Sequence, residues 1–99
     1  MTLTAKQRAQ LRSLAHPLKP VLHLGKDGLT EQSVRSLEEA FNGRELLKVK
    51  VQAGSPLSVD EAGAEQVARV PGAHLVQTIG RTVVLYRKHP EKPEILLRS

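Results

Sequence analysis

Two glycines flank a lysine and an aspartate in the segment Gly25-Lys26-Asp27-Gly28, and this spacing suits the binding of an anion. Glycine lets the backbone turn tightly and approach a ligand closely, because it has no Cβ atom. Thr30 follows as a predicted helix N-cap, and the first N–H groups of a helix are unpaired and lie at its positive dipole end. The segment therefore favours a phosphate ligand, with Lys26 as the ionic contact and the glycines as the point of backbone approach.

The positive charge of the chain is concentrated in the segment that leads into this glycine loop. The formal net charge is +5, and the sequence pI is near 10.0. No acidic residue precedes position 27, and the ten cations that follow are matched by ten acids. This segregation favours a polyanionic partner, either nucleic acid or an acidic membrane surface. We call residues 1–26 the basic arm; its cations are Lys6, Arg8, Arg12, Lys19 and Lys26.

Two further groups of cations are candidate contacts for a phosphate backbone. Lys48 and Lys50 alternate onto one face of an expected strand, although a solvated strand face explains them equally well. Arg81 belongs to an acid-free run, residues 66–90, whose other late cations are Arg87 and Lys88. Whether this second run adjoins the glycine loop depends on the fold.

The residues that other chemistries require are absent or badly spaced. The chain has no cysteine, so it has no disulfide and no thiolate metal site. A nucleotide-binding P-loop needs Ser or Thr directly after its lysine, whereas Asp27 follows Lys26. No nucleophile is paired with an orienting base, so we expect no enzyme, no cofactor and no metal. The histidines lack metal-binding spacing; they are His16, His23, His74 and His89.

Composition also limits how the chain could bind nucleic acid. With one Phe, one Tyr and no Trp, stacking of unpaired bases is not expected to dominate, and shape and backbone recognition of structured RNA fits better. Tyr86 could stack on a base, but a lone tyrosine in an apolar strand is more often core. No stretch approaches the roughly 18 apolar residues of a membrane span, so we expect a cytoplasmic protein.

Three helices and four strands are needed to position these residues. Thr4 with Gln7 and Ser58 with Glu61 form capping boxes, which predict helix starts at these two points. Thr30 begins a further helix that Asn42-Gly43 ends. Strands are predicted at residues 21–24, 45–51, 74–79 and 82–87, with Gly80-Arg81 as a tight turn between the last two.

The predicted order is α-β-α-β-α-β-β, an α/β (α+β two-layer) arrangement around one sheet. Strands that alternate with helices imply parallel crossovers, while the last hairpin is antiparallel, so we expect a mixed, four-stranded sheet. Alternation in residues 45–51 predicts one core face and one cationic face. A single domain should span residues 1–88, followed by a short and mostly mobile tail at residues 89–99.

Four motifs occur in the same order and spacing as in a known family. They are Leu18-Lys19-Pro20-Val21, Gly25-Lys26-Asp27-Gly28-Leu29-Thr30, the run from Glu45 to Val51, and the run from Ile79 to Arg87. From residue 2 to about 88 the chain closely resembles the bacterial YhbY family, the free-standing form of the chloroplast RNA splicing and ribosome maturation (CRM) domain. The resemblance implies a fold like the C-terminal domain of translation initiation factor three. It also implies RNA binding through the glycine-x-x-glycine loop, from which Asp27 departs by adding a negative charge.

Together, the residues and the resemblance lead to one functional hypothesis. The chain is expected to be a monomeric, non-catalytic binder of structured RNA, acting on precursor RNA of the large ribosomal subunit. The alternative from another class is a protein-interaction module whose basic face docks an acidic, ribosome-associated partner.

Overall fold

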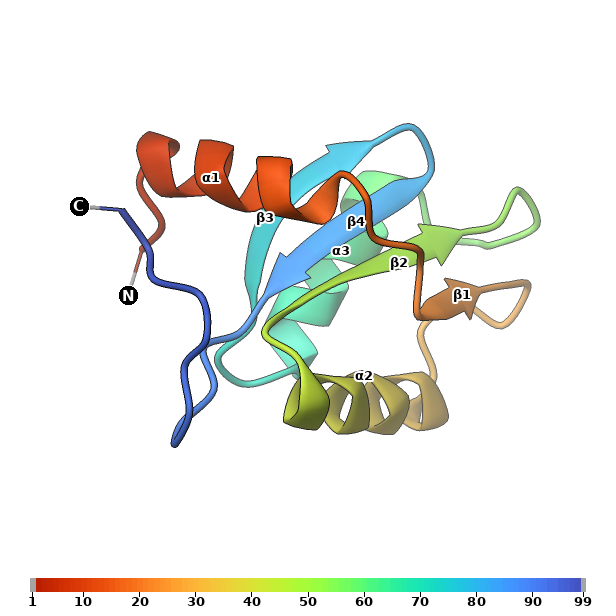
Figure 1. Ribbon diagram of the computed structural model, residues 1–99. Coiled ribbons are helices and arrows are strands. Elements are labelled where there is room, and N and C mark those ends of the chain that lie inside the picture. Colours follow the sequence, from red (N-terminus) through yellow and green to blue (C-terminus); the bar gives the residue numbers. More distant parts are fainter. Residues whose placement is uncertain (1, 99) are drawn as a thin grey trace.

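The computed structural model describes residues 2–98, which form three helices and one four-stranded sheet (Figure 1). In chain order the elements are α1 (Ala5–Ala15), β1 (Leu22–Leu24), α2 (Glu31–Gly43), β2 (Leu46–Val51), α3 (Val59–Arg69), β3 (His74–Ile79) and β4 (Thr82–Tyr86). The predicted order of helices and strands is confirmed. Among these residues, no helix combines the length and the apolar character needed to cross a membrane.

Side-chain caps set the starts of all three helices. The Thr4 hydroxyl accepts from the Gln7 N–H at 3.1 Å, and the Gln7 side chain accepts from the Thr4 N–H at 3.0 Å. Ser58 and Glu61 make the same reciprocal pair. At α2 the Thr30 hydroxyl accepts from the N–H of Ser33 at 3.1 Å. Each cap satisfies N–H groups that a helix start would leave unpaired, and the predicted caps are confirmed.

The sheet has the strand order β1-β2-β4-β3, with β1 parallel to β2 and the other two neighbouring pairs antiparallel. The mixed sheet predicted from the sequence is therefore confirmed. Gly80 has a φ of 57° at the β3–β4 turn, a left-handed conformation that glycine adopts without steric cost. Strands β2 and β4 occupy the centre, and the three-residue β1 lies at one edge.

Helices α2 and α3 cover one face of the sheet, and α1 lies across the other (Figure 1). The α2/α3 face contains the larger apolar cluster, in which the Leu37 and Phe41 side chains of α2 are buried. The strand residues in this cluster are Leu24, Leu47, Val49, Val51, Val83 and Leu85. This face is the core face predicted from the alternation in β2.

The opposite face is wrongly predicted as simply cationic, because α1 covers half of it with a second apolar cluster. Leu11 and Ala15 of α1 are buried there against Leu46, Val84 and Tyr86. The Tyr86 side chain is 1% exposed, so the core interpretation of this residue is confirmed. Burial also raises the pKa of its hydroxyl, with a smaller contribution from the negative charge of Glu45.

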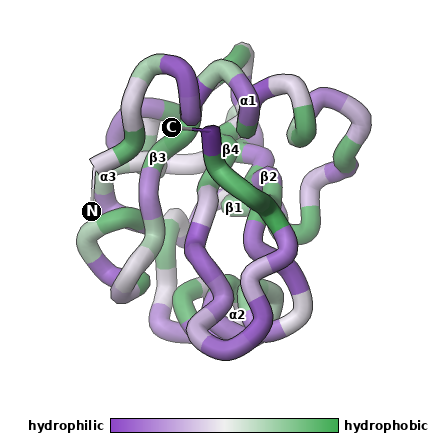
Figure 2. Tube along the Cα trace, turned by 60° about the vertical axis from the view of Figure 1, so that its left-hand side comes forward, coloured by the Kyte–Doolittle hydropathy of each residue, from purple (hydrophilic) through white to green (hydrophobic). Residues whose placement is uncertain are grey.

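The segment after β4, residues 87–98, folds back along this second cluster. Figure 2 shows a hydrophilic stretch followed by a hydrophobic one that ends near α1. Ile95 and Leu97 pack against the cluster, and the Gln10 side chain bonds the backbone on both sides of Leu97, at 2.7 Å and 2.8 Å. These contacts place the tail on the domain, while its expected mobility and the domain limit at residue 88 stay predictions.

One buried carboxylate fastens this tail. Glu45 is 5% exposed and accepts backbone N–H bonds from His89, Glu94 and Ile95, each at 2.8 Å. Burial opposes ionisation of the Glu45 carboxyl, but the three N–H donors and the positive charge of His89 outweigh it, and the pKa lies below its ordinary value. We call this arrangement the Glu45 clasp.

Candidate functional site

The glycine loop is an exposed turn at one end of the molecule. The N–H of Gly28 donates to the carbonyl of Gly25 at 3.0 Å, which closes a four-residue turn after β1. Lys26 and Asp27 are exposed at its apex, while Gly28 is buried at its base. The loop lies where β1 leads into α2 (Figure 1). A phosphate could therefore reach the Lys26 ammonium without any rearrangement of the domain.

The structure restricts the two glycines of the loop to different degrees. Gly28 has a φ of 65°, and a Cβ atom there would lie 3.3 Å from Cγ of Pro56. Gly25 has no such φ, but a Cβ atom would lie 3.3 Å from the side-chain oxygen of Gln52. The glycine loop is thus packed beside the β2–α3 connection. Backbone conformation and contact with Pro56 account for Gly28, whereas at Gly25 the exposed Gln52 side chain could move aside, so the fold does not by itself require glycine there.

The start of α2 adds partial positive charge beside the loop, but acidic residues offset it. The helix N-terminus carries unpaired N–H groups and the positive end of the dipole. Glu31 lies in the first turn of α2, and Asp27 lies in the loop itself. Lys26 is the cation that the loop contributes, so additional attraction for an anion must come from neighbouring strands.

Two of the predicted cations lie at the same end of the molecule as the glycine loop. Lys50 is exposed near the end of β2, and its register partner on β1 is His23, two residues before the loop begins. Arg81 is exposed at the tip of the β3–β4 hairpin. Its carbonyl accepts from the N–H of Val51 at 2.7 Å, which holds the hairpin tip beside the end of β2. The fold therefore brings Lys26, Lys50 and Arg81 to one end.

The Lys48 side chain makes a hydrogen bond within the domain. Its ammonium donates to the backbone carbonyl of His16 at 3.1 Å, directly after the last turn of α1. A cation at this position donates to an otherwise unpaired carbonyl and is attracted by the negative end of the helix dipole. Lys48 therefore ties α1 to β2, and a phosphate would have to compete with this bond.

The cations of the basic arm are spread along α1 and are not gathered at the glycine loop. The helix runs with its first turn pointing away from the loop end (Figure 1). Lys6 lies in that first turn, about 14 Å along the axis from Ala15 at the other end. The Arg8 guanidinium donates to the carbonyl of Leu3 at 3.0 Å. Arg12 is exposed in the last turn, and Lys19 is exposed in the connection from α1 to β1.

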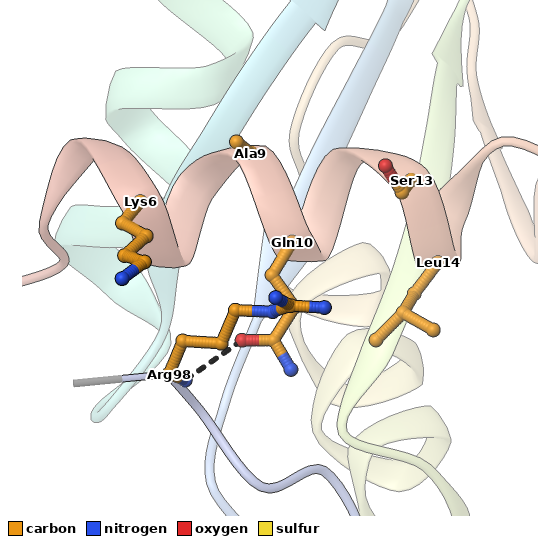
Figure 3. Close-up of a pocket in the computed structure, with 6 residues that line it drawn as sticks. All are labelled: Lys6, Ala9, Gln10, Ser13, Leu14 and Arg98. Carbon is orange, nitrogen blue, oxygen red and sulfur yellow. Dashed lines mark hydrogen bonds between the residues drawn. The ribbon is translucent and has the colours of Figure 1, made fainter.

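Lys6 instead lines a shallow depression of about 370 Å³ with Arg98 of the tail (Figure 3). Gln10 also lines this depression and accepts from the Arg98 N–H at 2.8 Å. The depression also includes Ala9, Ser13 and Leu14 of α1. This pair of cations lies on a different part of the surface from Lys26.

The second cationic run is divided between the two ends of β4. Arg81 precedes the strand, whereas Arg87 and Lys88 follow it, about 20 Å away along an extended chain. The Arg87 guanidinium lies 5.0 Å from the ring centroid of Phe41, a cation–π contact that engages it structurally. Of Arg81, Arg87 and Lys88, Arg81 is the one that adjoins the loop end.

Sequence reasoning missed Arg69, which supports the glycine loop from α3. Its guanidinium donates to the carbonyl of Leu29 at 3.0 Å, just after the loop. The two residues are 40 positions apart, and nothing in the sequence pattern links them. Within residues 2–98, no group of three or more His, Cys, Asp or Glu side chains could hold a metal ion.

Comparisons with known proteins agree with this architecture. The family model of the CRS1/YhbY (CRM) domain matches residues 3–87. The chain is 39% identical over 95 residues to Bacillus subtilis "Probable RNA-binding protein YqeI", covering 96% of this chain and 98% of that one. It is 44% identical over 90 residues to a Haemophilus influenzae protein named "RNA-binding protein", covering 91% and 90%.

A solved structure from Staphylococcus aureus, described as that of a candidate RNA-binding protein, matches with a TM-score of 0.77 and 36% identity. The match covers 98% of this chain and 100% of that one.

Proposed function

The chain belongs to the CRS1/YhbY (CRM) domain family, and we propose that it is a non-catalytic RNA-binding protein whose glycine loop contacts the sugar-phosphate backbone of structured RNA. The names of its relatives support RNA as the partner. One observation carries the assignment of the loop: Lys26 is exposed at the apex of a turn that lies at the same end as Lys50 and Arg81. A phosphate backbone lying across this end would meet three cations.

The predicted cations contribute unequally, because they lie at different distances from the loop. Charges separated by more than a Debye length, about 8 Å at physiological ionic strength, are largely screened from each other. Lys26, Lys50 and Arg81 therefore provide the direct ionic contacts, whereas Lys6 at the far end of α1 adds a weaker, longer-range attraction. Arg12 and Lys19 lie at intermediate distances from the loop. The Arg8 guanidinium already donates to the Leu3 carbonyl.

Binding to RNA should weaken with added salt in a way that reports these contacts. Each neutralised phosphate releases counterions and contributes about −0.7 to the slope of log affinity against log salt for a single strand. Three direct contacts thus predict a slope of about −2. Fluorescence anisotropy with labelled RNA between low and moderate salt measures it, and a slope near zero would contradict phosphate contact as the basis of binding.

We further propose that the bound RNA is precursor RNA of the large ribosomal subunit, and family membership supports this choice. The protein should then cosediment with large-subunit precursor particles from cell extract and leave them after ribonuclease treatment. Association that survives ribonuclease would favour docking to an acidic protein instead. The cytoplasmic location and monomeric state stay predictions.

A further inference from the structure

Four side chains form a row across all strands near the glycine loop. Lys50 of β2 is paired with His23 of β1 on one side and with Thr82 of β4 on the other, and Thr82 is paired with Ile79 of β3. Paired residues on neighbouring strands point to the same face of a sheet. Lys50 lies two residues after Lys48, whose ammonium reaches the end of α1, so the row is on the α1 face. We call these four residues the end row.

Helix α1 leaves the end row uncovered. The buried contacts of α1 reach Leu46 of β2 and Val84 of β4, and both residues lie farther from the glycine loop than the end row does. In the end row, Lys50 and His23 are exposed and Ile79 is 59% exposed. Figure 1 shows the ends of β1 and β2 extending beyond the last turn of α1. The row is therefore a solvent-facing strip of sheet with an apolar side chain at one end.

The end row connects the glycine loop with the hairpin tip. On one side His23 lies two residues before Gly25, and on the other Ile79 lies two residues before Arg81. Three spacings between neighbouring strands give a strip about 14 Å long. It contains one ammonium, one imidazole, one hydroxyl and one aliphatic group, and no acid. This composition complements a polyanion that also exposes apolar ring faces.

We propose that the end row binds an unpaired RNA segment that continues from the glycine loop across the strand ends to Arg81. The inference rests on the proposed function, because it extends the RNA from the phosphate held at Lys26. Lys50 and Arg81 contact phosphates, and the Thr82 hydroxyl donates to phosphate or ribose oxygens. Ile79 and the His23 ring pack against base faces, a contact that every base can make.

The test compares a blunt-ended RNA hairpin with two extended hairpins. Each extended hairpin carries a single-stranded extension of about six nucleotides, one at the 5′ end and the other at the 3′ end. Ile79→Ser should lower affinity for one extended hairpin about fivefold and leave the blunt hairpin unchanged. The salt slope should not change, since no charge is removed. Leu96→Ser is the matched control, because Leu96 is an exposed apolar side chain (84%) of the tail, and it should have no effect.

Lys50→Ala provides a second readout, because it removes one ionic contact. The salt slope for the extended hairpin should become shallower by about 0.7, with Lys92→Ala, an exposed lysine of the tail, as the unchanged control. Circular dichroism of each variant verifies the fold.

Affinity of Ile79→Ser for both extended hairpins within about twofold of the unsubstituted protein would overturn the end row as a binding surface. Equal weakening for blunt and extended hairpins would overturn the unpaired segment as its ligand. Both results leave the proposed function standing if Lys26→Ala still weakens binding of both hairpins. If the unsubstituted protein binds neither hairpin, both inferences fail together.

Discussion

A double variant with Lys26→Ala and Gly28→Asp should bind structured RNA about tenfold more weakly than the unsubstituted protein and give a shallower salt slope. The first change removes the cation at the apex of the loop. The second places a carboxylate, with a Cβ atom 3.3 Å from Pro56, at the base of the turn. The first change removes an attraction for a phosphate and the second adds a repulsion at the same loop, and anisotropy titrations against salt measure the combined effect.

The double variant should remain folded, which keeps this result interpretable. Gly28 is buried and has a φ of 65°, so aspartate costs about 1 to 2 kcal/mol in backbone strain and also crowds the Pro56 side chain. The Thr30 cap that begins α2 is untouched. Lys92→Ala with Gly43→Asp is a matched control at other exposed sites, since a Cβ atom at Gly43 meets nothing within 4 Å. Retained affinity in the folded loop variant would move the RNA site elsewhere.

Glu45→Ala should cost about 2 kcal/mol of unfolding free energy and lower the Tm by roughly 10 °C. The substitution removes the acceptor of three backbone N–H bonds from the tail, each 2.8 Å long. Without it, the backbone at Ile95 loses its anchor, and the part of the apolar cluster that Ile95 covers is opened to water. Urea unfolding measures the loss, and amide NMR signals of residues 89–98 should report a released tail.

Glu94→Ala is the matched control for this variant. The Glu94 side chain is exposed, and only its backbone N–H takes part in the Glu45 clasp, so the substitution should leave stability within about 0.5 kcal/mol. An equal loss in both variants would show that the Glu45 clasp does not hold the tail.

The same clasp gives stability a defined dependence on pH. The pKa of Glu45 is lower in the folded state, so its contribution is fully present above the unfolded value of about 4.3. It is lost as the pH falls through the folded pKa. Glu45→Gln carries no ionisable group there, so its stability should fall less steeply below about pH 4.3 than that of the unsubstituted protein.

The features that could be predicted from sequence are those set by residues close together along the chain. Each cap, such as Ser58 with Glu61, joins residues three positions apart, and Gly80 is sufficient to specify the hairpin turn. The alternation in β2 correctly identifies the face on which Leu47 lies. Such signals determine the order of elements and, through helix-separated strands, most of the pairing in the sheet.

The features that could not be predicted depend on which segments meet in space. The basic arm is continuous in sequence, but α1 carries Lys6 away from Lys26, so a run of charge does not become one surface patch. The Glu45 clasp binds backbone N–H groups, which every residue except proline possesses, so no side-chain pattern in the tail indicates it. The end row required the register of all four strands.

The place of β1 in the sheet has a consequence for the mobility of the glycine loop. This strand has three residues and one neighbour, whereas β2 and β4 are bonded on both sides. Opening of β1 breaks few hydrogen bonds, although it also removes Leu24 from the core, so it costs less free energy than opening the centre. The glycine loop is thus attached to a short edge strand of the sheet. If the loop contacts RNA as proposed, local opening at that edge would let it adjust to an irregular RNA surface while the rest of the sheet stays closed.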